Sequence, residues 1–180
     1  MNPEYITLVS IGYPGKKMPE LIAHDVEVEF QLPVSIKEGF LDLEEFYDSV
    51  RGQYNGNMLL RRVDEVFSSD NSKTLAVFNV DLFIPILTFI FGQAFLNGAS
   101  GISSLHRLRN ERYGLPVNNN VLLDRLRKEV IHELGHTFGL IHCFDPVCVM
   151  RSSTYVEDID QKSHKLCQKC KNELMQMQRT

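Results

Sequence analysis

The sequence predicts an α/β (α+β) fold, a compact single domain in which a mixed, twisted β-sheet packs against a long helix. Three observations predict it. Segments with strand and helix patterns alternate through the first half of the chain. A long amphipathic helical pattern follows, and a more polar segment with all four cysteines ends the chain. We therefore divide the domain 1–180 into a mainly sheet-forming part (1–116), the long helix (117–139) and a C-terminal part (140–180).

The first third of the chain contains two segments with strand patterns. Residues 5–11 are apolar and β-branched, which predicts a buried strand, and Pro14-Gly15 predicts a turn after it. Residues 19–24 fit a short helix. From residue 26 to residue 32, apolar side chains alternate with glutamate or glutamine. This period of two predicts a second, half-buried strand.

The middle of the chain continues the alternation. Residues 59–67 fit a helix after an Asn-Gly-Asn turn, and residues 75–80 are apolar enough for another buried strand. Residues 89–96 and 102–108 flank an Asn-Gly pair, which predicts two antiparallel strands. A mixed sheet follows from these assignments.

The long helix is predicted to begin near Asn118–Asn120, which are good capping residues, and to end at about Phe138. On a helical wheel its leucine, isoleucine and valine residues lie on one side, opposite His132 and His136. One face of the helix is therefore expected in a core and the other along a cleft.

The segment that ends this helix has the pattern H-E-x-x-H-x-x-G-x-x-H. His132 and His136 lie one turn apart on one helix face, so their imidazoles can bind one zinc ion. Glu133 is placed to reach a water on that metal. Gly139 can end the helix, so that the chain turns back and His142 becomes the third ligand. Three protein ligands leave one position open, which is typical of a catalytic zinc.

The cysteines suggest a second metal site. Cys143, Cys148, Cys167 and Cys170 lie close behind the histidine motif, and the last two form a C-x-x-C pair. Four thiolates satisfy a closed, structural zinc. Two disulfides or a redox C-x-x-C are the alternatives. The sequence shows no secretion signal, and a redox pair would leave Cys143 and Cys148 without a role.

Two further features bear on the cysteine site. Lys162, Lys165, Lys169 and Lys171 surround the C-x-x-C and could offset the charge of a zinc–thiolate centre, although a solvated basic helix face would look the same. His142 and Cys143 are adjacent. If both zinc sites exist, the structural zinc would hold the third catalytic ligand in place.

The pattern from His132 to Cys143, followed by the C-x-M of Cys148–Met150 and the C-x-x-C, resembles the archaemetzincin family of zinc metallopeptidases in the metzincin clan. The cysteine directly after the third histidine is the distinctive part. Residues 91–94 and 103–108 also resemble that family. The resemblance implies a compact metzincin-like domain.

The resemblance also implies a role for each motif residue. His132, His136 and His142 would bind the catalytic zinc, and Glu133 would be the catalytic base. The four cysteines would bind the second zinc, giving two zinc ions per chain. Met150 would be the Met-turn methionine, which lies beneath the site without binding the metal.

We therefore predict a zinc-dependent peptidase, a hydrolase that cleaves peptide bonds with zinc-activated water and with Glu133 as general base. The alternatives are a catalytically silent, zinc-stabilised binding protein on the same fold and an enzyme that hydrolyses non-peptide amides. Endopeptidase and aminopeptidase modes both remain open at this stage. His106 and Tyr155 are weaker candidates for contact with the oxyanion or the substrate, since ordinary packing or surface roles are the more common ones for such residues.

Composition and charge limit the kinds of partner that the chain is expected to bind. The net charge of −4 argues against a nucleic-acid surface. Residues 82–96 are apolar, but they are too short to span a membrane and contain Pro85 and Gly92. The N-terminal residues lack a signal-peptide pattern. We expect a cytoplasmic monomer with peptide or protein substrates, no nucleic-acid partner and no membrane association.

Overall fold

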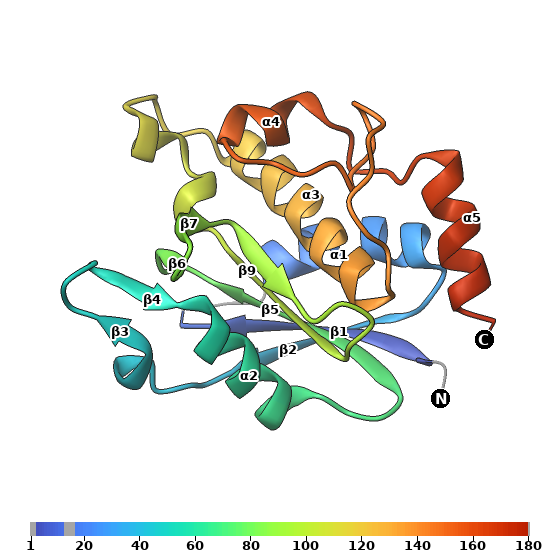
Figure 1. Cartoon of the computed structure of the whole chain (residues 1–180), viewed down its shortest axis with the longest axis horizontal. Helices are drawn as coiled ribbons and strands as arrows, with labels where there is room; N and C mark the ends of the chain where they lie inside the picture. Colours follow the sequence, from blue (N-terminus) through green and yellow to red (C-terminus); the bar gives the residue numbers. More distant parts are fainter. Residues whose placement is uncertain (1–2, 13–16, 180) are drawn as a thin grey trace.

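The computed structural model describes residues 3–12 and 17–179, and it has two β-sheets covered by helices (Figure 1). The larger sheet has the strand order β2-β1-β5-β9-β8, and the smaller has the order β3-β4-β6-β7. The strands are β1 (Tyr5–Ile11), β2 (Val34–Gly39), β3 (Tyr47–Asp48), β4 (Gln53–Asn55), β5 (Ser72–Phe78), β6 (Leu82–Ile84), β7 (Leu87–Ile90), β8 (Gly92–Ala94) and β9 (Ser100–Ser104).

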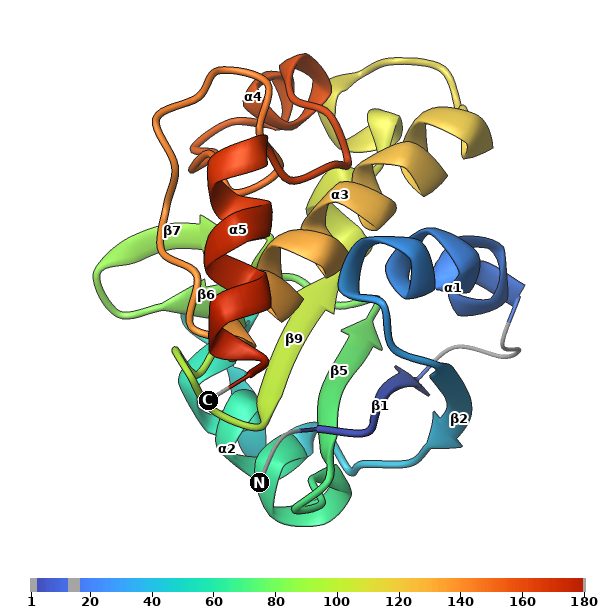
Figure 2. The same ribbon diagram turned by 90° about the vertical axis from the view of Figure 1, so that its right-hand side faces the viewer.

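Five α-helices accompany the sheets in the described residues. They are α1 (Lys17–Phe30), α2 (Gly56–Phe67), α3 (Asn119–Thr137), α4 (Val156–Gln161) and α5 (Gln168–Met177). Helices α1 and α3 lie on one face of the large sheet and α2 on the other (Figures 1 and 2). Short 3-10 turns lie at Glu44–Phe46, His106–Leu108 and Asn110–Tyr113. The mixed α/β fold predicted from the sequence is confirmed.

The large sheet separates two hydrophobic cores. Because successive side chains of a strand point to opposite faces, Leu8 and Leu75 pack with α1 and α3, whereas Val9 and Ala76 pack with α2. Strands β2, β1, β5 and β9 run parallel, and only β8 at the edge is antiparallel to its neighbour. This antiparallel edge is where the functional site lies.

The strand predicted at residues 26–32 is wrong, because this segment continues helix α1. Ile22, Val26 and Phe30 recur every four residues and form the buried stripe of the helix. Val28, which a strand would have buried, is half exposed. Glu29 is buried because its carboxylate accepts the backbone N–H of Leu166. The next strand of the chain is instead β2, beside β1.

Most of the remaining predicted elements are confirmed with shifted ends, but the strand predicted at 102–108 ends at Ser104, before the 3-10 turn His106–Leu108. The strand at 5–11, the helix at 59–67 and the strand at 75–80 correspond to β1, α2 and β5. The segment 89–96 divides into β7 and β8, which belong to different sheets, and β8 pairs antiparallel with β9 as expected. The Pro14-Gly15 turn lies outside the described residues.

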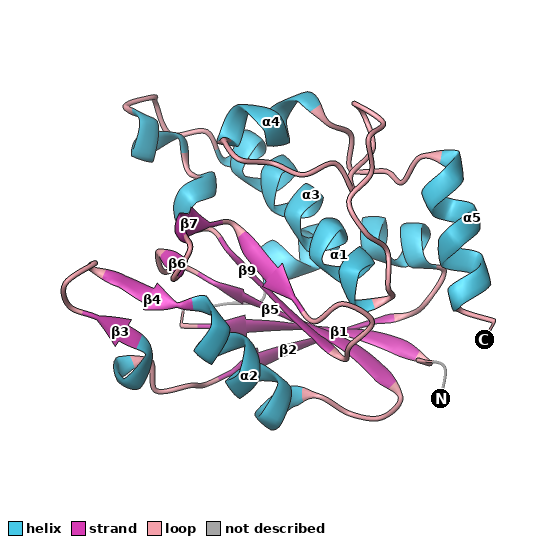
Figure 3. Cartoon of the chain, in the orientation of Figure 1, coloured by secondary structure: helices cyan, strands magenta, loops and turns pink. Residues whose placement is uncertain are grey.

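Helix α3 is built as the sequence predicts. The Asn118 side chain caps its start by accepting the backbone N–H groups of Asn120 and Val121. At its other end Gly139 has a positive φ of 99°, and its N–H donates to the His136 carbonyl. The chain then runs without helix or strand to α4 (Figure 3). Within the described residues, no helix is long and apolar enough to cross a membrane.

Candidate active site and metal centres

Helix α3 and the chain after it bring three histidines together. His132 and His136 project from one face of α3, and the turn at Gly139 returns His142 to them. The nitrogens of the three rings lie within 4.8 Å of one another, so the group could hold a metal ion. The histidine cluster predicted from the spacing is therefore present in the fold.

Hydrogen bonds orient two of these rings. His132 donates from Nδ1 to the Val149 carbonyl, and His136 donates from Nδ1 to the Leu140 carbonyl, each at 2.8 Å. The two Nε2 atoms then carry lone pairs that face each other at 3.2 Å. Two such lone pairs repel each other unless a cation lies between them. The backbone carbonyls thus orient both rings so that their Nε2 atoms could bind a metal ion.

The spacing fits zinc. A tetrahedral zinc ion with bonds of about 2.0–2.1 Å to nitrogen places two nitrogens about 3.3–3.4 Å apart. Burial lowers the pKa of His132 well below its ordinary value, and burial also lowers the pKa values of His136 and His142. All three rings therefore favour the neutral form, which is the form that binds metals.

Glu133 is buried beside this cluster and directly under the edge strand. A Cβ added to Gly92 of β8 would lie 2.8 Å from the Glu133 Cγ atom, so only glycine permits this approach. Burial, with a smaller contribution from the charge of Glu129, raises the pKa of Glu133 well above its ordinary value. The carboxyl group is thus held close to the histidine cluster in a poorly solvated position.

A cavity of about 500 Å³ opens over these residues. One side is formed by the chain from β6 to β8 and the other by the loop before α4. Its lining includes the three histidines and Glu133 together with Gln93, Glu129, Ser152, Ser153, Thr154, Tyr155 and Lys162. Because residues of β8 and the histidine cluster line the same cavity, one bound molecule can contact both.

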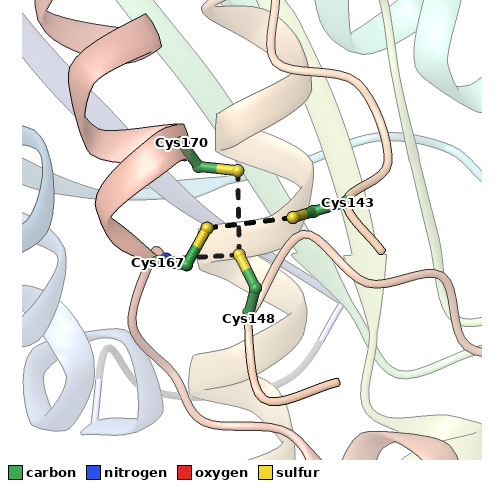
Figure 4. Close-up of side chains that lie close together, drawn as sticks. All are labelled: Cys143, Cys148, Cys167 and Cys170. Carbon is green, nitrogen blue, oxygen red and sulfur yellow. Dashed lines mark hydrogen bonds between the residues drawn. The ribbon is translucent and has the colours of Figure 1, made fainter. Parts of the chain in front are cut away.

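The four cysteines form a second cluster (Figure 4). Its first member, Cys143, directly follows the third histidine in the sequence. Cys143 and Cys148 come from the loop after α3, while Cys167 and Cys170 come from the start of α5. None of the four forms a disulfide. The Sγ atoms of Cys143 and Cys167 are 3.8 Å apart, as are those of Cys148 and Cys170.

These distances fit a tetrahedral zinc–thiolate centre, in which bonds of about 2.3 Å place the sulfurs about 3.8 Å apart. A disulfide would need about 2.05 Å. Backbone N–H groups of Asp145 and Cys167 point at the sulfurs of Cys143 and Cys148. Burial raises the pKa of Cys148 to about 11, so a cation is needed to hold it as a thiolate.

Met150 packs beneath the histidine helix. It is fully buried, and its thioether lies so close to Gly135 of α3 that a Cβ there would collide with it. The Met150 carbonyl also accepts the N–H of Cys143. These contacts join the loop of the cysteine cluster to the helix of the histidine cluster.

The structure places several other residues differently from the sequence-based expectation. Lys162 does not belong to the cysteine cluster, because its ammonium lies in the cavity wall, 3.4 Å from the Glu129 carboxylate. Tyr155 lines the cavity, whereas His106 lies against Asp81 outside it. Glu129 and Lys162 were missed as a pair because they lie 33 positions apart in the sequence. The position of Glu129 one turn before Glu133 was a usable signal.

Sequence comparison decides the family. The model of peptidase family M54 matches residues 16–176, which is most of the chain. The chain belongs to peptidase family M54. The M54 chain is 37% identical to an archaemetzincin of Thermococcus kodakarensis, over 94% of this chain and 95% of the relative. It is 43% identical to one from Methanocaldococcus jannaschii, over 71% of this chain and 69% of the relative.

Solved structures support the same assignment. An archaemetzincin from Methanopyrus kandleri matches the M54 chain with a TM-score of 0.84 and 31% identity, over 98% of this chain and 97% of that one. A zinc-dependent peptidase from Methanocorpusculum labreanum matches with a TM-score of 0.80 and 31% identity, over 94% and 99%. This M54 chain is therefore a zinc metallopeptidase, with a three-histidine and a four-cysteine group that are able to bind metal ions.

Proposed function

We propose that the chain hydrolyses peptide bonds in this cavity, with His132, His136 and His142 holding a catalytic zinc ion and Glu133 acting as general base. The opposed Nε2 atoms of His132 and His136, beside a buried carboxylate in the same cavity, carry this proposal. Zinc bound there would lower the pKa of a water molecule and polarise a peptide carbonyl.

The protein residues then have distinct roles. Glu133 accepts the proton of the attacking water and passes it to the leaving amine. Its burial supports this role, because a carboxylate with a raised pKa takes a proton from water more readily than a solvated one. Val149 and Leu140 hold the rings of His132 and His136 through their carbonyls, so that the ligand nitrogens need no reorganisation.

The substrate is proposed to lie extended along β8. This strand is the edge of the large sheet, and among the described residues it pairs on one side only, with β9. Its residues line the cavity next to Glu133. An extended peptide can therefore add to the sheet through main-chain hydrogen bonds, which would present one peptide bond to the site.

The four cysteines are proposed to hold a structural zinc, and Met150 to form the non-ligating floor of the site. The sulfur distances, which fit a zinc–thiolate centre, support the first proposal. The packing of the Met150 thioether against α3 supports the second. We further propose that the chain acts in the cytoplasm as a monomer on peptide or protein substrates. Light scattering of the purified chain measures its molar mass in solution and so tests whether it is a monomer.

Mass-spectrometric profiling of a diverse peptide library tests the peptidase. The zinc-loaded chain is compared with chelator-stripped chain and with stripped chain to which zinc is returned. We expect cleavage with the first and third samples only, and the product ends read out endopeptidase or aminopeptidase mode. Absence of cleavage with both zinc ions bound would contradict the proposal and favour a binding protein on this fold.

A further inference from the structure

Glu129, Ser153 and Lys162 form a polar wall of the cavity that the proposed hydrolysis does not use. Glu129 precedes Glu133 by four residues on α3, so the two carboxyl groups share one helix face and lie one turn apart. Lys162 follows α4, and its ammonium pairs with Glu129 at 3.4 Å and donates to the Arg151 carbonyl at 3.1 Å. All three residues line the cavity.

This wall has hydrogen-bonding capacity to spare. The Glu129 side chain is only 5% exposed and that of Lys162 only 1%, yet within the described part of the chain Glu129 Oε1 has no hydrogen-bond partner. Its contact with the Lys162 ammonium, at 3.4 Å, is an ion pair. The buried Ser153 hydroxyl is also unpartnered among the described residues. Buried polar atoms without partners are costly, which points to a ligand that supplies them.

We propose that Glu129, Ser153 and Lys162 form a subsite for a substrate side chain bearing a primary amide, that of asparagine or glutamine, at a position flanking the scissile bond. This inference rests on the proposed peptidase function and names its specificity. One helical turn separates the subsite from Glu133, so the bound residue is next to the bond that is cleaved.

The charges of the wall exclude other side chains. Glu129 and Lys162 neutralise each other, so a basic or an acidic side chain would bring an unbalanced charge next to this buried ion pair. An apolar side chain would leave Glu129 Oε1 and the Ser153 hydroxyl unpaired. A primary amide has both N–H donors and a carbonyl acceptor, so it can bond to the carboxylate and to the ammonium or hydroxyl.

Affinity selection tests the subsite without requiring turnover. Zinc-loaded Glu133→Ala protein is immobilised, incubated with a random octapeptide library and eluted, and the retained peptides are sequenced by mass spectrometry. We expect asparagine and glutamine to be enriched roughly tenfold or more at one position, since each unpaired buried group costs about 1–3 kcal/mol.

Two further variants in the same background test the charge argument. Glu129→Gln leaves the ammonium uncompensated, so aspartate and glutamate should replace the amides at that position. Lys162→Met leaves the carboxylate uncompensated, so lysine and arginine should be selected. Zinc content and circular dichroism identify misfolded variants.

Retention without an amide preference, the same preference in all three proteins, or no retention would each overturn the subsite. The proposed peptidase function is judged separately by cleavage of the library with the unmodified chain. Cleavage without an amide preference would therefore refute the subsite alone. Absence of cleavage together with amide-selective retention would refute the proposed peptidase function, but it would leave the amide-binding subsite standing.

Discussion

Gly92 is the residue that lets the edge strand approach the proposed base. A Cβ at this position would lie 2.7 Å from the Ile102 carbonyl oxygen and 2.9 Å from Glu133 Oε1. Gly92→Ala should therefore displace the Glu133 carboxylate or the strand. We expect turnover of a library-derived peptide to fall at least tenfold while the zinc content stays the same, because the three atoms nearest to this methyl group belong to Ile102 and Glu133 and not to a histidine.

Gly101→Ala on β9 is the matched control. It adds the same methyl group to the same strand pair, but the nearest neighbours of its Cβ would be Ala94, Leu75 and the Gln93 carbonyl, at 3.2–3.5 Å, and not Glu133. Turnover should be affected much less by this substitution. Equal activity of the Gly92→Ala variant and the unmodified chain would show that the approach of β8 to Glu133 does not matter for catalysis.

For single residues, the sequence predicted the clustered histidines well, but it predicted poorly which other side chains surround them. The spacing of His132, His136 and His142 predicted the cluster because helix geometry and a glycine stop are local properties. Lys162 was expected near the cysteines because it is close to Cys167 in the sequence, but its ammonium pairs with Glu129. Long-range pairing of this kind depends on the tertiary fold, which residue spacing does not encode.

Among the elements, helix α3 was the most predictable and α1 the least. The start of α3 was visible in the asparagines that cap it, and its end in Gly139. The glutamates of α1 alternate with apolar residues from residue 26 to residue 32, which is a strand pattern. The apolar residues of α1 also fit a helical stripe, so the sequence allowed both assignments. Glu29 is buried by contacts with Leu166 and Lys171, which lie far away in the sequence. No local pattern predicts a buried glutamate, so the helix could not be distinguished from a strand by the sequence pattern.

The division of residues 89–96 into two strands has a similar cause. A continuous apolar segment predicts extended chain but not the sheet that it joins. Here β7 pairs with β6 and β8 pairs with β9, so the segment passes from the small sheet to the large one. The passage places both strands along the cavity and leaves β8 as an open edge.

In the molecule as a whole, the cysteine cluster joins the C-terminal helix to the loop that carries the third histidine. Cys143 follows His142 directly, and its N–H donates to the Met150 carbonyl. Helix α5 also reaches α1, because the Gln178 side chain donates to the Phe30 carbonyl. A zinc ion at the cysteines would therefore stabilise the fold and the position of His142 together.

Cys167→Ser tests this link. We expect the zinc content to fall from two ions per chain to one, the thermal midpoint to drop by several degrees, and turnover to fall because the loop of His142 is no longer held. Metal analysis by mass spectrometry and calorimetry measure these effects. Lys169→Ser is the control, since it lies inside the same C-x-x-C with an exposed side chain. Two zinc ions and full stability in the Cys167→Ser variant would refute the structural site.

One paired measurement tests most directly whether Glu133 acts as the base beside a zinc held by three histidines. Zinc content and peptide turnover are determined on the same preparations of the unmodified chain and of the Glu133→Ala variant. We predict two zinc ions in both proteins and a loss of turnover of about 10²–10⁴-fold in the variant. Turnover that persists in a fully zinc-loaded Glu133→Ala variant would contradict the assignment of the base.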